Sequence, residues 1–222
     1  MGRAWALVGC VAAVSLAAPG VRADVGDLHV HAAEPPGDGL YGRWDRDLTL
    51  SVEAGGALGW FAGVPRAGGV RREWSVVGTV RARFFDAAGP SLAVRYGPDA
   101  GRDLFAAIEL RPLFPALFLL DRFTGHERLD LTLQSLGAEL GAVTPLDGAG
   151  HVAFAWALGV ETPLVLVHHT ARGLWLRAAV RRVRVHPSAR HVGLGSPPSS
   201  WTLTLSLAWH LQANLGLARS RE

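Results

Sequence analysis

Most of the chain alternates between apolar residues and polar or small residues with a period of two. The clearest stretch is 201–213, where Trp201, Leu203 and Leu205 begin a row of bulky apolar residues at every second position. Rows of the same kind run through 48–60, 76–85, 92–96, 104–111, 152–160 and 173–181. Because successive side chains of a β-strand point to opposite faces, each stretch predicts a strand with one apolar face. The pattern therefore predicts an all-β protein of about eight strands.

Three stretches depart from this alternation. Residues 113–123 hold an apolar cluster, which predicts either a short interfacial helix beginning near Pro115 or a turn packed on the end of the sheet. Residues 129–143 alternate in two phases, which predicts a strand with a β-bulge near Ser135. The same residues also match a helical stripe, formed by Leu129, Leu133, Leu136 and Leu140. A smaller change of phase is expected at 182–185, at the far end of the strand that begins at 173.

Segments rich in glycine and proline separate the predicted strands. A short turn is expected at 87–90. Pro112 ends the strand before it, because proline cannot donate a hydrogen bond to a neighbouring strand. Longer connections are expected to form loops at 61–73, 97–103, 145–150 and 186–200. They follow the first, third, fifth and seventh strands, so an up-and-down order places them at one end of the sheet.

The N-terminal segment predicts export from the cytoplasm. Arg3 precedes a short apolar stretch, and the residues at 21–23 predict cleavage after Ala23. An uncleaved anchor is the alternative, but the apolar stretch is short for a membrane span. Cys10 is the only cysteine and ends a Leu-Val-Gly-Cys sequence that resembles a lipobox, so lipidation is a second alternative. Cleavage would leave a mature chain without cysteine, which excludes disulfides and cysteine catalysis.

The composition of the two strand faces indicates which face is interior. One face is nearly pure Leu, Val, Phe and Trp, whereas the opposite face mixes Ala and Gly with charged residues. Small residues fit a narrow lumen, and buried charges require partners of opposite sign. The bulky face is then expected to meet lipid. The inward charges are expected to form a structural network in the lumen that contains Glu53, Arg81, Arg83, Glu109, Arg111, Glu139, Glu161, Arg177 and Arg181.

Tryptophans near the strand ends favour a membrane barrel, because amphipathic aromatic residues prefer the headgroup level of a bilayer. The expected interface residues are Trp44, Trp60, Trp74, Trp201 and Trp209. The predicted fold is therefore an all-β, closed, antiparallel, up-and-down transmembrane β-barrel of about eight strands. Its expected organisation is a signal peptide at 1–23, a flexible segment at 24–46, the barrel domain at 47–217 and a tail at 218–222.

The signal peptide, the strand spacing and the final strand at 201–215 resemble those of small outer-membrane proteins of Gram-negative bacteria. The family is that of the OmpA-like eight-stranded transmembrane barrels in the broad sense, as an uncharacterised subfamily, and the resemblance covers 48–217. It implies an outer-membrane location, contact with outer-membrane lipid, and contact with the barrel-insertion machinery during biogenesis. One departure is that the chain continues to 218–222 instead of ending in a terminal aromatic residue.

Charge and motifs narrow the range of functions. Loss of Arg3 and Arg22 with the signal peptide lowers the formal net charge from +3 to +1, which does not favour nucleic acid as a partner. The sequence lacks a glycine-rich phosphate-binding motif. His186 and His191 lie without cysteine or paired carboxylates nearby in the sequence, so neither a metal nor another cofactor is expected.

We therefore expect an outer-membrane barrel with a structural or surface-interaction role and no catalytic site. Two alternatives stay open. The first is a lipid-modifying or small-solute-handling barrel, in which His151 would act with Ser135 or Ser206 of another strand as base and nucleophile. The second is a soluble periplasmic barrel that binds an apolar ligand in its centre. The sequence makes no prediction about the oligomeric state.

Overall fold

The computed structural model describes residues 43, 46–61, 71–98, 101–120, 122–147, 152–167, 171–184 and 199–215. The chain divides into two units, Met1–Pro36 and Gly37–Glu222, and every described residue lies in the second. The predictions for the signal peptide at 1–23, for Cys10, Trp44 and His151, and for the tail at 218–222 lie outside the described residues.

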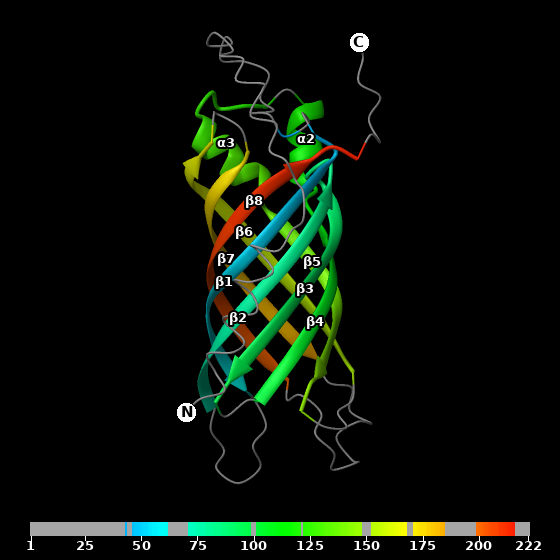
Figure 1. The fold of residues 1–222 in the computed structure, drawn as a ribbon, viewed down its shortest axis with the longest axis vertical. Helices are drawn as coiled ribbons and strands as arrows, with labels where there is room; N and C mark the ends of the chain where they lie inside the picture. The colour runs from blue at the N-terminus through cyan, green and yellow to red at the C-terminus, as the bar shows by residue number, and fades with distance from the viewer. Residues whose placement is uncertain are drawn as a thin grey trace. The chain divides into compact units, whose positions relative to one another are not determined.

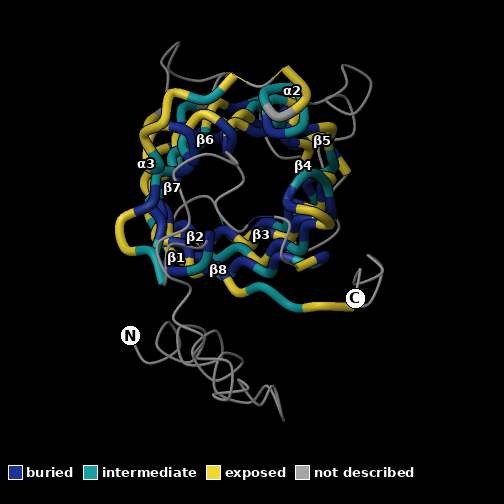
Figure 2. Tube along the Cα trace, turned by 90° about the horizontal axis from the view of Figure 1, so that it is seen from above, coloured by how far each residue is buried: buried dark blue, intermediate teal, exposed yellow. Residues whose placement is uncertain are grey.

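Eight antiparallel strands form a closed barrel, in which each strand pairs with its neighbours in the sequence and β1 pairs with β8. This topology confirms the predicted all-β, closed, antiparallel, up-and-down barrel of eight strands. Figure 1 shows the strands running up and down around the barrel, and Figure 2 shows them as a ring seen from above. The strands are β1 Leu48–Phe61, β2 Arg71–Phe84, β3 Ala88–Gly97, β4 Gly101–Leu110, β5 Gly137–Pro145, β6 Ala153–Leu166, β7 Gly173–Arg184 and β8 Ser200–Ala213.

Two short helices, α2 (Leu113–Leu119) and α3 (Glu127–Gln134), lie at the end of the barrel where β1 begins and β8 ends (Figure 1). We call this the helix end, and the opposite end the loop end. The four predicted loops all join strands at the loop end. Two of them are shorter than predicted, because β2 already begins at Arg71 and β4 at Gly101.

For 113–123 and 129–143 the sequence left more than one structure open, and the structure shows which of them forms. A helix is found within 113–123, and it begins before Pro115, which the first turn of a helix tolerates. For 129–143 each alternative is right for one half, since α3 occupies the first part and β5 the second. The predicted bulge near Ser135 is wrong. This residue caps the end of α3, and its backbone N–H donates to the Leu131 oxygen at 3.1 Å.

The turn between β2 and β3 lies earlier than the predicted 87–90. Phe85 and Asp86 have left-handed backbones, with φ of 51° and 52°, and the Ala87 N–H donates to the Phe84 oxygen at 3.0 Å. Two consecutive left-handed residues match the twist of an antiparallel hairpin. The sequence lacks the Gly or Asn that usually marks such a turn, so the pattern pointed instead to Gly89 and Pro90, which lie within β3.

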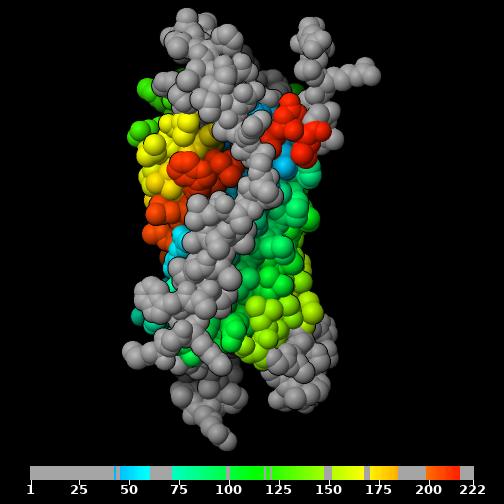
Figure 3. All heavy atoms as spheres, in the orientation of Figure 1, coloured from blue at the N-terminus to red at the C-terminus, as the bar shows by residue number. Residues whose placement is uncertain are grey.

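Outward and inward positions alternate along the wall. Leu92 and Leu205 on the outer face are 52% and 56% exposed, whereas the inward positions of the same strands are mostly buried. Figure 3 shows one side of this wall, where side chains of neighbouring strands close the surface. The change of phase predicted at 182–185 is wrong. Val183 is buried, half-buried Arg182 and exposed Arg184 flank it, and β7 keeps its register with β6 there.

The register fixes the tilt of the strands. The chain of paired residues that starts at Leu48 in β1 returns to β1 at Leu58, ten residues further along. With strands about 4.8 Å apart and a rise of about 3.3 Å per residue, a shift of ten over eight strands gives a tilt of about 40°. The ten residues of β4 then rise about 25 Å, which is roughly the height of the apolar band of an outer-membrane barrel.

Two adjacent glycines of β1 offer a matched test of this packing. At inward Gly55 a Cβ atom would meet the backbone oxygen of Leu205 and lie 2.6 Å from the Cβ of Ser206, whereas at Gly56 nothing lies within 4 Å. We expect Gly55→Ala to lower the free energy of unfolding by about 1–3 kcal/mol through overpacking. Gly56→Ala is expected to change it by less than about 0.5 kcal/mol. Denaturant unfolding of both variants checks this, and equal stabilities would contradict the register.

Candidate functional site

The charged residues that the sequence predicts for the lumen lie at inward positions of six strands or directly after one of them. Glu53 lies on β1, Arg81 and Arg83 on β2, and Glu109 on β4, with Arg111 one residue beyond that strand. The others lie on β5, β6 and β7. Eight of the nine predicted residues have at most 4% of their surface exposed, and we call these eight the lumen charge network: Glu53, Arg81, Arg83, Glu109, Arg111, Glu139, Glu161 and Arg177.

Glu109 is one of the two central carboxylates of the network. Its Oε1 accepts from Nη1 of Arg81 at 2.9 Å and from Nη1 of Arg177 at 3.3 Å. Arg111 also donates to Oε1, through Nε at 3.4 Å, and Arg83 donates to Oε2 at 3.4 Å. A single fully buried carboxylate is therefore surrounded by four guanidinium groups. Such a number of charge-assisted hydrogen bonds offsets the cost of removing the charge from water.

Glu161 is the second central carboxylate, and it contacts the same group of arginines from β6. Its Oε2 accepts from Nη2 of Arg111 at 2.6 Å, and its Oε1 accepts from Nη1 of Arg177 at 3.0 Å and from Arg81. The Nε2 atom of His210 lies 3.2 Å from Oε2. Arg177 is the direct neighbour of Glu161 in the β6–β7 pair, whereas Arg81 reaches Glu161 from β2. The contact with Arg81 therefore crosses the lumen and ties distant walls of the barrel together.

The other two carboxylates of the network, Glu53 and Glu139, have their partners nearer the barrel wall. Glu53 forms an ion pair with Arg81 and accepts hydrogen bonds from the hydroxyls of Ser206 at 3.2 Å and Ser51 at 3.4 Å. Glu139 forms an ion pair with Arg177. Beside this arginine the described side chains leave a cavity of about 20 Å³, which is large enough for about one water molecule. Charged side chains therefore occupy most of the space around Arg177.

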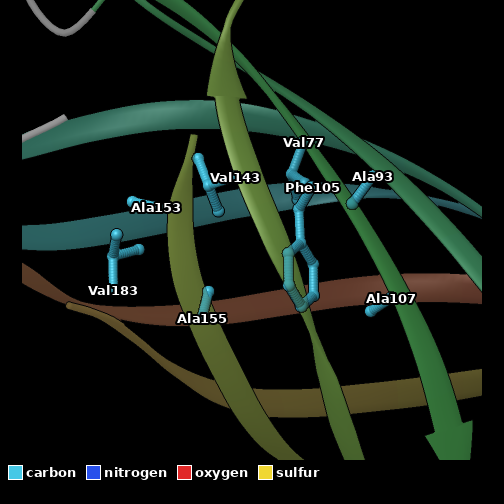
Figure 4. Close-up of a cluster of buried hydrophobic side chains, with 8 residues drawn as sticks. All are labelled: Val77, Ala93, Phe105, Ala107, Val143, Ala153, Ala155 and Val183. Carbon is cyan, nitrogen blue, oxygen red and sulfur yellow. The ribbon is translucent and has the colours of Figure 1, made fainter. Parts of the chain in front are cut away.

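Arg181, the ninth predicted residue, is placed differently. Its guanidinium lies over the ring of Phe105, 4.0 Å from the centroid, toward the loop end. Phe105 belongs to a buried apolar cluster that fills this part of the lumen (Figure 4). The cluster consists of Val77, Ala93, Phe105, Ala107, Val143, Ala153, Ala155 and Val183. Nearby, Nε of Arg95 donates to Asp103 at 2.7 Å. The lumen thus changes from ionic to mainly apolar toward the loop end.

Arg43 lies at the helix end of the lumen, in a role that no pattern in the sequence predicted. It lies within the predicted flexible segment 24–46, yet its side chain is fully buried. It forms an ion pair with Asp86, donates to the Leu131 oxygen of α3 at 3.1 Å, and lies over the ring of Phe114 of α2 at 5.2 Å. A residue before β1 therefore joins both helices and the β2–β3 turn.

Asp86 of the β2–β3 turn is the acceptor at this end. Besides Arg43, it accepts from Nε of Arg83 at 2.8 Å and lies 3.4 Å from Nη1 of Arg111. Burial alone would raise the pKa of Asp86, but the three guanidinium groups overcome this effect and hold the pKa below its ordinary value. Burial lowers the pKa of Arg43 to about 10, so this guanidinium stays protonated at neutral pH.

The outward tryptophans lie at two levels. Trp60 pairs with Trp201 across β1 and β8, and Trp74 pairs with Leu58 two residues from Trp60, so these three lie together near the loop end. Trp209 lies near the helix end, where it pairs with Val52. A fourth tryptophan at the loop end, Trp156, contacts Trp201 edge to face at 5.6 Å and was not among the predicted interface residues. Trp175 points inward instead, where it stacks on His210.

The candidate serines are buried and do not lie on the outer face of the barrel. Ser206 points into the lumen toward Glu53, and the Ser135 hydroxyl donates to the Glu161 backbone oxygen at 2.6 Å. Their proposed partner His151 lies outside the described residues. Among the described residues, no group of three or more His, Cys, Asp or Glu is arranged to hold a metal ion. No helix in that part of the chain is long and apolar enough to cross a membrane.

Comparisons with known proteins give similarity at the level of the fold. No family model matches the chain, and no curated protein matches its sequence. The chain is similar to the structure of Ail, the attachment invasion locus protein of Yersinia pestis, in complex with the heparin analogue sucrose octasulfate. The identity is 11% over 74% of this chain and 99% of that chain, with a TM-score of 0.41.

Two further solved structures are similar to a comparable extent. One is the de novo designed TMB2.3, with 12% identity over 76% of this chain and 96% of that chain and a TM-score of 0.39. The other is Neisserial surface protein A (NspA), with 13% identity over 75% of this chain and 97% of that chain and a TM-score of 0.39. The structure itself is a small, closed, antiparallel barrel of eight strands with an exposed apolar wall and an ionic lumen.

Proposed function

We propose that this chain is an integral β-barrel of the bacterial outer membrane with a structural or surface-interaction role rather than a catalytic one. The observation that carries the proposal is the arrangement of the wall, with bulky apolar residues exposed outside and ionised residues enclosed inside. Soluble monomers rarely expose apolar patches beyond roughly a few hundred Å². In lipid such a wall is favourable, and barrel closure satisfies the backbone groups of every strand.

The filled lumen supports a role outside the barrel rather than through it. Ion pairs across the lumen and the apolar cluster near the loop end leave little space for a solute. The cavity beside Arg177, of about 20 Å³, is itself too small for an apolar ligand. With the helix end in the periplasm, the loop end would face outward and present its connections there. Outer-membrane lipid and, during biogenesis, the insertion machinery are the proposed partners.

Two measurements test the proposed function. The barrel is expected to remain in the membrane pellet after salt and carbonate washes and to require detergent for release. In detergent it should migrate faster on an unheated gel than on a boiled one, because closed barrels keep their fold until heated. Release of the native protein by carbonate alone, with no shift in mobility on heating, would contradict an integral barrel.

A further inference from the structure

The outer face of the strands carries arginine but no carboxylate. Among the outward positions of the described strands, the charged residues are Arg72, Arg102, Arg182 and Arg184. Each of them alternates with buried inward neighbours such as Glu73, Asp103 and Val183, so its outward position follows from the register. The inner face, by contrast, holds roughly equal numbers of acidic and basic groups. The excess of positive charge on the outer face is therefore not balanced by carboxylates of the same face, and the lumen network does not explain it.

All four outward arginines lie at the loop end, and each pairs across strands with an outward aromatic residue. Trp60 is opposite Arg72, Tyr96 is opposite Arg102, and Phe154 is opposite Arg184. Arg182 lies between Trp156 on β6 and Trp201 on β8. At the helix end, Trp209 pairs with Val52 and Leu174 instead. Arginine therefore accompanies the aromatic residues of one membrane interface and not those of the other.

Arg182 and Arg184 form the best-built part of this surface. They point to the same side of β7 about 7 Å apart, since they are two residues apart on one strand. The Arg182 guanidinium lies 4.9 Å from the centre of the Trp201 ring, which holds it at the aromatic level. Neither side chain forms an ion pair with a described carboxylate, whereas Arg102 is paired with Asp147 at 3.1 Å.

We propose that Arg182 and Arg184, together with Trp156 and Trp201, bind the anionic phosphate of a lipid headgroup in the leaflet at the loop end. The proposal rests on the proposed membrane location. Guanidinium groups recognise phosphate through two parallel hydrogen bonds, and aromatic residues beside them place the phosphate at the headgroup level. The adjoining wall, with Leu203 and Val180, then contacts the acyl chains of the same lipid. The expected partner is a lipid whose headgroup carries a net negative charge on its phosphate, rather than a lipid with a zwitterionic headgroup.

Native mass spectrometry of the full chain in neutral detergent tests this. Dioleoyl phosphatidate and dioleoyl phosphatidylcholine are titrated in parallel, and bound lipids are counted. We expect phosphatidate to bind at a roughly tenfold lower concentration than phosphatidylcholine, as two arginines near an anionic headgroup predict. The double variant Arg182→Gln/Arg184→Gln should lose this preference. The matched control Arg122→Gln/Arg128→Gln, which removes two exposed arginines at the helix end, should keep it.

The outcomes separate this inference from the proposed function. Equal phosphatidate binding by the wild type and Arg182→Gln/Arg184→Gln overturns the inference, and so does displacement of phosphatidate by excess inorganic phosphate, which would indicate an ion site. If the glutamine variant loses its heat-modifiable mobility, Arg182→Lys/Arg184→Lys carries the test. It keeps the charge but loses bidentate geometry, so the preference should weaken without disappearing. A wild type released by carbonate would contradict the membrane location itself.

Discussion

Glu161→Gln is expected to lower the free energy of unfolding by about 3–5 kcal/mol, because it removes one partner of a buried ionic network while leaving the others in place. Arg111, Arg177 and Arg81 all donate to this carboxylate from within the lumen. Glutamine has almost the same shape, so the loss reports the missing charge rather than a cavity. Reversible denaturant unfolding in detergent or lipid, followed by tryptophan fluorescence, measures the change.

Two comparisons make this result specific to the lumen. Asp147→Asn removes a carboxylate from a pair in which both side chains are nearly half exposed, and it should cost less than about 1 kcal/mol. The double variant Glu161→Gln/Arg111→Gln should be less destabilised than the sum of its single changes, with a coupling of at least about 1 kcal/mol. If Glu161→Gln and Asp147→Asn lowered the free energy of unfolding by the same amount, water would have to reach the lumen charge network.

The period-two pattern predicted the strands and their faces because the outer face and the lumen of the barrel hold different kinds of residue at alternate positions. Leu203, Leu205 and Leu207 meet the outside, and the residues between them meet the lumen, so one local rule holds along the whole strand. That rule weakens where apolar residues are exposed without being in a strand. Leu129 and Leu133 of α3 are 47% and 43% exposed, and both Asp130 and Leu131 between them are buried. The spacing of Leu129 and Leu133 therefore predicted a helix only as one of two alternatives, and it marked the exposed side of that helix rather than its buried side.

The charged residues of the lumen were predictable by type and face but not by partner. Arg81 and Glu161 lie 80 residues apart in the sequence. They meet because the register shift of ten residues around the barrel brings these two positions of β2 and β6 opposite each other across the lumen. No local pattern encodes that shift. Arg43 was missed for a related reason, since a single residue before β1 shows no periodicity, and its partner Asp86 lies in a turn without the usual glycine or asparagine.

An arginine placed on the outer face should reveal the solvent around the barrel by how its cost depends on depth. Leu205 lies midway along β8 and Leu211 near its end, and the two are 56% and 50% exposed. In a membrane, Leu205→Arg is expected to cost about 2–4 kcal/mol and Leu211→Arg about 0–1 kcal/mol, because only the first guanidinium lies far from the headgroups. Unfolding in lipid vesicles measures both. In water the two sites are nearly equivalent surface positions, so costs that are small and alike for both variants would contradict the lipid-facing wall.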